Sequence, residues 1–306
     1  MSRVSLVRPL FDGPLDLIGD VHGEIDALQN LLRKLGYSPD GVHPHGRRLV
    51  YLGDLTDRGP DSPAVVDLVH RQLVAGLAQC VLGNHDLNIL LDEEKHDNRW
   101  FSGRDSSLDR SGEVTPAVLA DNAIRQRVRT LFQSLPLALE RHDLRVVHAC
   151  WEPAMIDVAR DADDAVRLYR AFVERIDAEN ATRPECDPVD RELAHQNGNP
   201  VKVITSGPER RAAVPFEASG KFRHEERAPW WTGYRDEPLC VFGHYGIVYG
   251  QPRPQGRTVC VDYAVGKRWF ERRKQNFNGR FRGRLAAFRH PERLMMFDDY
   301  SSDEPQ

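Results

Sequence analysis

The stretch LDLIGDVHG, residues 15–23, joins a short apolar run to a turn that carries a carboxylate, an imidazole and two glycines. The pattern returns in LVYLGD at residues 49–54 and in CVLGNHD at residues 80–86. Between these runs, residues 24–35 and 62–77 carry apolar side chains near helical spacing. Strand–helix–strand units of about thirty residues predict right-handed crossovers and parallel strands. Because ligands collect at the carboxyl ends of such strands, we expect all three turns at one edge of a sheet.

The second half of the chain has a less regular pattern. Residues 178–200 are polar and rich in turn formers, which predicts an inserted loop. Apolar spacing predicts helices at residues 116–135 and 162–177, strands at 144–148, 239–242 and 258–263, and a hairpin within 284–297 that breaks near His290.

Composition narrows the class of protein. The 306 residues are 40% hydrophobic and 29% charged, as expected for a globular protein with one large domain. No apolar run is long enough to span a bilayer or to form a signal-peptide core, so we expect a cytoplasmic protein. The net charge of −4, with Lys and Arg spread along the chain, indicates no general polyanion-binding surface. Five cysteines without CxxC spacing predict buried thiols and disfavour a thiolate zinc site.

Carboxylate, imidazole or amide groups follow five of the apolar runs. They belong to Asp20 and His22, to Asp54, to Asn84, to His148 and to His244. Each alone has a structural explanation, because Asp and Asn cap helices and a lone His is often a hydrogen-bonded core residue. Together, at the same kind of position, they favour two divalent cations. Mixed oxygen and nitrogen ligands without thiolate suit manganese best in our interpretation, with iron and zinc as alternatives.

The motifs GDVHG, GDLTDRG, GNHD, VHAC and FGHY, in this order between residues 19 and 245, resemble the calcineurin-like metallophosphoesterase superfamily. The DRG of residues 57–59 resembles the phosphoprotein phosphatase branch, which includes the symmetrical dinucleoside tetraphosphatases. The resemblance implies an α/β fold, a β-sandwich flanked by helices in four αββα layers. We expect one domain over residues 1–300, with an inserted segment at about 155–235 and a polar tail at 301–306.

The resemblance also assigns roles to single residues. It implies that Asp20, His22 and Asp54 hold one metal, and that Asp54, Asn84, His148 and His244 hold the other, so that Asp54 bridges.

The same resemblance makes His85 the general acid, Asp57 the residue that orients it, and Arg58 the residue that grips the phosphate oxygens. The family has a second phosphate-binding arginine after the fourth motif, for which Arg160 and Arg183 are the candidates. Two cations lower the pKa of a shared water, so that hydroxide exists at neutral pH and attacks phosphorus. An alkoxide leaving group needs a proton, which an imidazolium paired with a carboxylate supplies.

The motifs conflict on the substrate. The pair Asp57–Arg58 favours a phosphomonoesterase that resembles the serine/threonine protein phosphatases, acting on a phosphorylated protein or a small phosphoester. Asp86 and the residues after it favour instead a pyrophosphohydrolase of dinucleoside polyphosphates, resembling the symmetrical bis(5'-nucleosyl)-tetraphosphatases. The first is our leading hypothesis and the second its alternative. The acidic net charge and the DRG motif disfavour a nuclease, and the intact ligand positions disfavour an inactive scaffold. We expect no membrane partner.

The loop at residues 93–113 has two interpretations. In the first, the loop is a substrate rim, where Trp100 stacks on a base and an arginine binds a second phosphate. The alternative, which we favour, is a solvated loop that Trp100 and Phe101 anchor. An insertion at 160–200 is either a cap over the site or a packing helix with a loop, and Trp230 is expected in the core.

Overall fold

The computed structural model describes residues 4–107, 114–183, 185–218, 221–247, 256–274 and 276–299. The expected polar tail at 301–306 lies outside these residues. Two five-stranded sheets dominate the described chain. One sheet has the order β14 (Leu294–Phe297), β13 (Ala286–His290), β2 (Leu15–Ile18), β3 (Arg48–Tyr51) and β4 (Ala78–Cys80). The other has the order β1 (Val7–Pro9), β7 (Ala138–Glu140), β8 (Leu144–Val147), β11 (Leu239–Phe242) and β12 (Thr258–Cys260).

The strand directions agree with the repeating units of the sequence. β2, β3 and β4 pair in parallel, and so do β8, β11 and β12. The hairpin of β13 and β14 adds an antiparallel edge to β2, and its turn contains the bond before Pro291. All three turns of the first half therefore emerge at the carboxyl edge of one sheet, as predicted.

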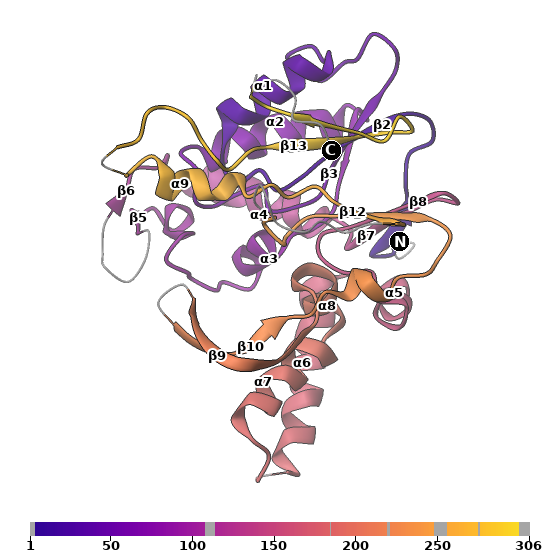
Figure 1. Ribbon diagram of the computed structural model, residues 1–306, viewed down its shortest axis with the longest axis vertical. Helices are drawn as coiled ribbons and strands as arrows, with labels where there is room; N and C mark the ends of the chain where they lie inside the picture. Colours follow the sequence, from indigo (N-terminus) through magenta and orange to yellow (C-terminus); the bar gives the residue numbers. More distant parts are fainter. Residues whose placement is uncertain are drawn as a thin grey trace.

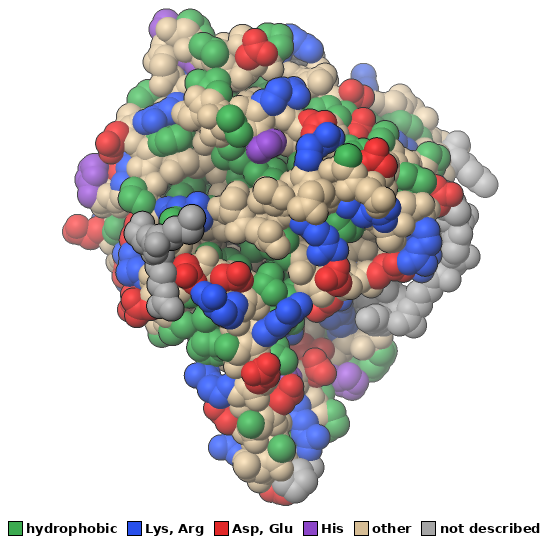
Figure 2. All heavy atoms as spheres, turned by 180° about the vertical axis from the view of Figure 1, so that it is seen from behind, with side chains coloured by type: hydrophobic (Ala, Val, Ile, Leu, Met, Phe, Trp, Pro, Cys, Tyr) green, Lys and Arg blue, Asp and Glu red, His purple; other side chains and the backbone are tan. Residues whose placement is uncertain are grey.

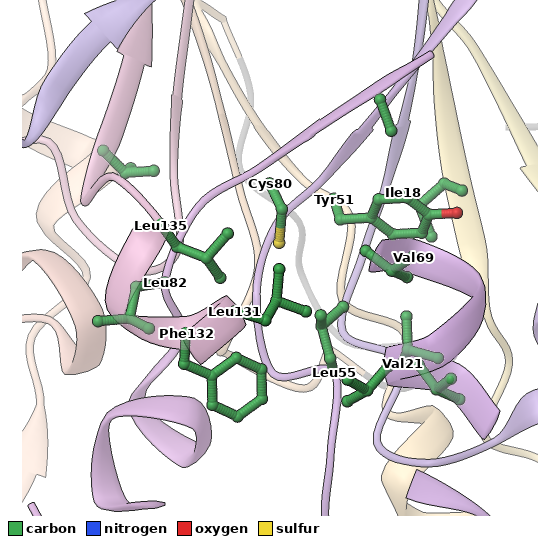
Figure 3. Close-up of a cluster of buried hydrophobic side chains, with 14 of the residues drawn as sticks. Ile18, Val21, Tyr51, Leu55, Val69, Cys80, Leu82, Leu131, Phe132 and Leu135 are labelled. Atoms are coloured by element: carbon green, nitrogen blue, oxygen red, sulfur yellow. The ribbon is translucent and has the colours of Figure 1, made fainter. Parts of the chain in front are cut away.

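The two sheets pack face to face because their strands alternate. In β2, Leu15 and Leu17 point into the core between the sheets, while Ile18 joins the core on the other face. In β11, Val241 enters the inner core and Phe242 the outer one. Successive side chains of a strand point to opposite faces, so a strand buried on both faces contributes apolar residues to both cores. The outer cluster in Figure 3 shows Ile18, Tyr51 and Cys80 from the first sheet packed against Val69 of a covering helix and Phe132 of another.

Helices cover both outer faces, which gives the expected mixed α/β architecture of two sheets flanked by helices (Figure 1). On one side lie α1 (Ile25–Leu35) and α2 (Ser62–Val74), and on the other α5 (Pro153–Arg160) and α8 (Pro200–Ser206). Local sequence sets their ends. Asp61 accepts a hydrogen bond from the Ala64 amide at the start of α2, and Gly36 ends α1 in the left-handed conformation.

Twelve further elements complete the described chain. They are α3 (Asn84–Leu90), η1 (Arg99–Ser102), β5 (Ser106–Ser107), β6 (Val114–Thr115), α4 (Asn122–Ser134), α6 (Ala165–Ala181), α7 (Pro188–Gly198), β9 (Glu209–Ala218), β10 (Lys221–Arg227), η2 (Trp230–Gly233), η3 (Val265–Lys267) and α9 (Arg268–Glu271).

Two predictions about elements are wrong. Residues 178–200 are not a loop, because α6 continues to Ala181 and α7 fills Pro188–Gly198 after a cap by Asp187. The helix expected from residue 116 begins only at Asn122, where Asp121 caps it. In α7, the Asp and Pro that suggested a turn mark a helix start instead. With α6, α7 forms the projection at the bottom of Figure 1, and the hairpin of β9 and β10 lies beside it.

The surface of the molecule mixes both signs of charge on the face that Figure 2 shows, including the projection. No helix of the described chain is long and apolar enough to cross a bilayer. Five cysteines carry free thiols, four of them buried, as the sequence predicted.

Candidate functional site

The six candidate metal ligands meet at the carboxyl edges of both sheets. Asp20 and His22 follow β2, Asp54 follows β3, and Asn84 starts α3 just after β4. From the second sheet, His148 follows β8 and His244 follows β11. All but Asn84 and His244, which are half-buried, are buried. The sandwich therefore brings together residues that lie up to 224 positions apart, as the contact between the His244 amide and Asp20 shows.

The backbone at the site is held in an uncommon conformation. His22, Asp54, Asp57, Arg58 and His244 all have φ between 47° and 75°, the left-handed region that non-glycine residues seldom adopt. Such strain collects where the surrounding structure needs a side chain aimed in one direction.

Two glycines let the carboxylates fit. A Cβ on Gly83 would lie 2.2 Å from Asp54 Oδ1, and one on Gly243 would lie 2.2 Å from Asp20 Oδ1. Any side chain at either glycine would displace a candidate ligand.

Asp54 lies at the centre of the cluster. Its Oδ2 is 3.8 Å from His22 Nε2 and 3.4 Å from His148 Nε2, while its Oδ1 accepts a hydrogen bond of 2.9 Å from the His85 amide. It belongs to two groups whose ligand atoms lie within 4.8 Å of one another, one with His22 and His85 and one with His148 and His244. A carboxylate shared by two such groups has the position of a bridging ligand.

The other candidate ligands surround this carboxylate. Asn84 Oδ1 is 3.2 Å from His148 Nε2 and 2.8 Å from His244 Nδ1, so the amide oxygen faces the same space as both imidazoles. His22 Nε2 lies 3.9 Å from Asp20 Oδ2. Backbone carbonyls orient two rings: His22 Nδ1 is 3.1 Å from the Thr56 oxygen, and His148 Nδ1 is 2.6 Å from the Leu52 oxygen. Such contacts orient each ring so that its Nε2 faces the other candidate ligands.

These groups fit divalent cations by their chemistry. Every donor is an oxygen or an imidazole nitrogen, which suits manganese, iron or zinc. Burial, together with Asp262 nearby, holds the pKa of Asp20 well above its usual range. Burial lowers the pKa of His148, but the carboxylates of Asp54 and Asp20 outweigh burial and raise this pKa to about 10. This surplus of buried negative charge is what bound cations would neutralise.

The candidate general acid stands beside this cluster. His85 Nδ1 is 2.7 Å from Asp57 Oδ2, and the indole Nε1 of Trp100 donates to Asp57 Oδ1 at 2.7 Å. Burial and Arg58 disfavour the imidazolium, but the carboxylates Asp54, Asp97 and Asp57 outweigh both and raise the pKa of His85 to about 9. The arrangement keeps a proton on His85 at neutral pH and points Nε2 into the site.

Arg58 borders the same space. Its Nη1 is 3.1 Å from His22 Nε2 and its Nη2 is 2.8 Å from His85 Nε2. Its Nε donates to Asp97 Oδ2 at 3.1 Å, which fixes the plane of the guanidinium while a third of the side chain remains exposed. A planar guanidinium fixed in this way is suited to two-point binding of phosphate.

Sequence reasoning missed some of these residues and misplaced others. Asp97 was missed, and Trp100 was considered only as a stacking or anchoring group. Trp100 is 1% exposed, so it is no stacking surface for a base, and its indole bonds to Asp57. The two candidates for a second phosphate-binding arginine lie elsewhere, because Arg160 pairs with Glu140 and Arg183 is exposed beyond the end of α6.

A further arginine, Arg227, approaches the candidate metal ligands beside His244. Its Nη1 donates to the His244 carbonyl oxygen at 3.1 Å, and its guanidinium lies over the ring of Tyr245 at 5.5 Å. Burial, followed by this arginine's charge, holds the pKa of His244 well below its usual range. Arg227 ends β10, so the hairpin that the sequence did not predict brings it to the site.

Comparison with known proteins agrees with this geometry. Residues 13–149 match the calcineurin-like phosphoesterase family. The chain contains a calcineurin-like metallophosphoesterase domain. It is a phosphoester hydrolase by family. The match contains the first three motifs and His148 of the fourth, while His244 lies beyond it.

Curated relatives align with nearly the whole chain. The chain is 28% identical over 289 residues to an asymmetrical bis(5'-nucleosyl)-tetraphosphatase, PrpE, of Geobacillus thermodenitrificans, covering 91% of each protein. The PrpE of Bacillus cereus is 27% identical and 90% of each chain is covered.

Solved structures share the fold. A putative diadenosine tetraphosphatase has a TM-score of 0.51 at 21% identity, with 96% of this chain and 97% of that chain covered. A protein serine/threonine phosphatase from Saccharomyces cerevisiae has a TM-score of 0.50 at 17% identity, with 98% and 84% covered. At these identities the likeness supports the architecture and leaves the substrate open.

Proposed function

We propose that this metallophosphoesterase hydrolyses a phosphoanhydride bond of a dinucleoside polyphosphate. The relatives that match it over nine-tenths of both chains carry the name asymmetrical bis(5'-nucleosyl)-tetraphosphatase, which supports this substrate class over the phosphomonoesters that the sequence ranked first. The reaction type rests on the position of Asp54. This buried carboxylate is shared by two groups of candidate metal ligands, and it lies beside His85 and Arg58, each of which is held by a carboxylate.

The residues proposed to hold the cations are those assigned from the sequence. Asp20, His22 and Asp54 would hold one ion, and Asp54, Asn84, His148 and His244 the other. Manganese is the proposed metal, with iron and zinc as alternatives. When bound, two such ions supply hydroxide at neutral pH and neutralise charge on the phosphoryl oxygens.

His85 would move the proton in this reaction. Asp57 accepts from its Nδ1–H, so Nε2 is the nitrogen that would deliver a proton to the departing oxygen once a bound phosphate takes over Arg58 Nη2, which lies 2.8 Å from Nε2. The indole of Trp100 donates a hydrogen bond to the other oxygen of Asp57, which keeps this carboxylate oriented toward His85. The pair therefore acts as a positioned general acid, whose value rises with the basicity of the leaving group.

Arg58 and Arg227 would bind the phosphate oxygens from two sides. Arg58 is fixed by Asp97, and Arg227 lies at the His244 end of the ligand cluster. Both guanidinium groups are partly or fully exposed, so a substrate has access to them. Arg227 replaces Arg160 and Arg183 as the proposed second phosphate-binding arginine.

A phosphomonoesterase is the second candidate function. The observation in its favour is the His85–Asp57 pair, because an alkoxide leaves poorly without a proton, whereas a nucleotide phosphate is already a good leaving group. On this hypothesis the substrate is a phosphorylated protein or a small phosphoester.

Product analysis tests the proposal. Manganese-loaded protein is incubated with diadenosine tetraphosphate, a phosphoserine peptide and an aryl phosphate, and products are separated by ion-exchange chromatography. We expect ATP and AMP from the dinucleotide, at a higher kcat/KM than the phosphopeptide gives phosphate. Two ADP would make the cleavage symmetrical. Turnover of the phosphopeptide without any nucleotide product would establish the second candidate instead.

Domain division and location remain proposals as well. We propose one domain over residues 1–300, with an inserted segment at about 155–235. The free thiols support a reducing compartment and hence the cytoplasm.

A further inference from the structure

A local excess of positive charge is hidden by the overall charge of −4. Residues 267–284, here called the cationic strap, contain eight Lys or Arg residues and one acidic residue. The structure describes all of the cationic strap except residue 275. The expected even spread of Lys and Arg along the chain therefore does not hold in this segment.

The cationic strap begins at the candidate metal site. Gly266 comes directly before it, and a Cβ on that glycine would lie 2.7 Å from His22 Cδ2 and 3.1 Å from Arg58 Nη1. Lys267, the next residue, is exposed. At the other end of α9, Arg272 donates through both terminal nitrogens to Glu24, two residues after His22. The residue before the segment thus packs against His22 and Arg58, and Arg272 joins the segment to the turn that carries His22.

Some charges of the cationic strap hold it in place. Arg268 pairs with Asp298 at 2.8 Å, and Arg284 pairs with Asp299 at 2.6 Å. Glu271, its acidic residue, is 8% exposed and accepts hydrogen bonds from the amides of Arg282 and Gly283. The acid inside the segment is therefore committed to its backbone.

Other charges of the cationic strap have no such role. Lys267, Lys274, Arg280 and Arg282 are exposed, and none has an acidic partner among the described residues. A cavity of about 1230 Å³ is lined by all four and by Glu24 at the site end. Among the described residues, Asp26 is the one acid of the lining that makes no side-chain hydrogen bond or ion pair. Glu24, Asp298 and Asp299 are neutralised by the anchoring arginines. The cavity therefore offers several unpaired cations, and Glu24 in its lining lies two residues after His22.

We propose that the cationic strap binds the phosphates of the substrate that lie beyond the phosphate being hydrolysed. The ligand class is an oligophosphate chain, two or three consecutive phosphates. This inference rests on the proposed function and deepens it. Arg58 would hold the reacting phosphate, and Lys267 with Arg282 would hold the chain that continues away from it. Lys and Arg bind such phosphates through charge-assisted hydrogen bonds.

The proposal has a consequence for the reaction. If three phosphates of a tetraphosphate lie along the cationic strap, the fourth lies at the metals, and cleavage is asymmetrical. The number of phosphates that the cationic strap accepts would thus select the anhydride that is broken. In that cleavage the oxygen of water would bond to the reacting phosphorus as the bond to the bridging oxygen breaks. The bridging oxygen would leave with the bound triphosphate and take the proton from His85.

The test uses inhibition, so that it runs whether or not a dinucleotide is a substrate. The manganese-loaded protein hydrolyses an aryl phosphate, and inhibition constants are measured for tripolyphosphate and for orthophosphate. The readout is their ratio, in which a general change in the enzyme cancels. Lys267→Gln/Arg282→Gln is compared with Arg170→Gln/Arg175→Gln, which removes two exposed positive charges from α6.

We expect tripolyphosphate to bind more tightly than orthophosphate in the wild type and in the α6 control. In Lys267→Gln/Arg282→Gln this preference should fall by about ten-fold, because each exposed ion pair contributes up to roughly a factor of five. The preference should also weaken as salt is added. An equal loss in both double variants, or no loss in the first, would overturn the proposal.

Two further outcomes would also overturn it: a wild type without any preference for tripolyphosphate, or stronger inhibition by an acidic peptide than by tripolyphosphate. The single variant Lys267→Gln serves if the double variant does not fold, with the same ratio as its readout. Failure of the proposed function has a different signature, since nucleotide products would be missing while the inhibition ratio remained.

Discussion

Replacing Trp100 with phenylalanine tests how much the orientation of the general acid His85 contributes to catalysis. The change keeps a ring in a site that is 1% exposed and removes the donor that lies 2.7 Å from Asp57 Oδ1. A hydrogen bond to a buried charged group contributes about 1.5–3 kcal/mol. If that free energy holds Asp57 against His85, its loss slows proton delivery by about ten- to hundred-fold. The effect should appear only with leaving groups that need the proton.

The assay is kcat/KM for a series of phosphate monoesters whose leaving groups span a wide range of pKa. We expect Trp100→Phe to lower the rate for alkyl phosphates strongly and for p-nitrophenyl phosphate by less than about three-fold, since a nitrophenolate departs without help. The matched control is Phe101→Leu, which perturbs the adjacent buried ring. A uniform loss over the series, or the same dependence in both variants, would refute the role assigned to Trp100.

Other perturbations separate metal binding, protonation and stability. Asn84→Ala should lower the bound metal by about one ion per chain, by elemental analysis, while Asn88→Ala on the same helix should retain it. Because carboxylates raise the pKa of His85 to about 9, the protonated acid persists until the pH rises through that value, so alkyl phosphatase activity should fall above it. Asp57→Asn removes one of these carboxylates and should move the decline to lower pH; an unmoved pH profile would contradict the pairing. At the opposite edge of the sheet, Asp16 is fully buried and bonded to two arginines. Asp16→Asn should therefore lower the free energy of unfolding in urea by about 3 kcal/mol without changing metal content, and a stability close to wild type would contradict this account.

Local patterns predicted the parts of the fold that depend on short stretches of chain. The runs before Asp20, Asp54 and Asn84 form parallel strands because their apolar residues suit burial on both faces. Their polar ends meet because parallel strands end at one edge. The second sheet adds His148 and His244 by the same rule. The positions of the candidate ligands therefore followed from strand patterns, whereas their roles as ligands rest on the resemblance and remain to be tested.

Contacts between distant segments could not be read from such patterns. Trp100 and Asp57 are 43 residues apart, and Asp97 reaches Arg58 across 39. Nothing in the spacing of the loop at 93–113 indicates that its tryptophan points inward to a carboxylate. Arg227 was missed for a related reason, because a hairpin of mostly polar residues lacks the apolar alternation that marks a strand.

The helix at Pro188–Gly198 was missed because none of its residues is fully buried. A helix without a buried face has no apolar stripe to show in the sequence. Its start is marked by Asp187 and by the proline after it, a signal equally typical of a turn.

A pair of metal ions bridged by Asp54 is the central claim, and electron paramagnetic resonance of the manganese-loaded protein tests it most directly. With elemental analysis alongside, we predict two manganese ions per chain and the multiline spectrum of an exchange-coupled pair, which Asp54→Asn abolishes together with phosphatase activity. One ion per chain, two uncoupled ions, or an Asp54→Asn protein with unchanged coupling and activity would contradict the account.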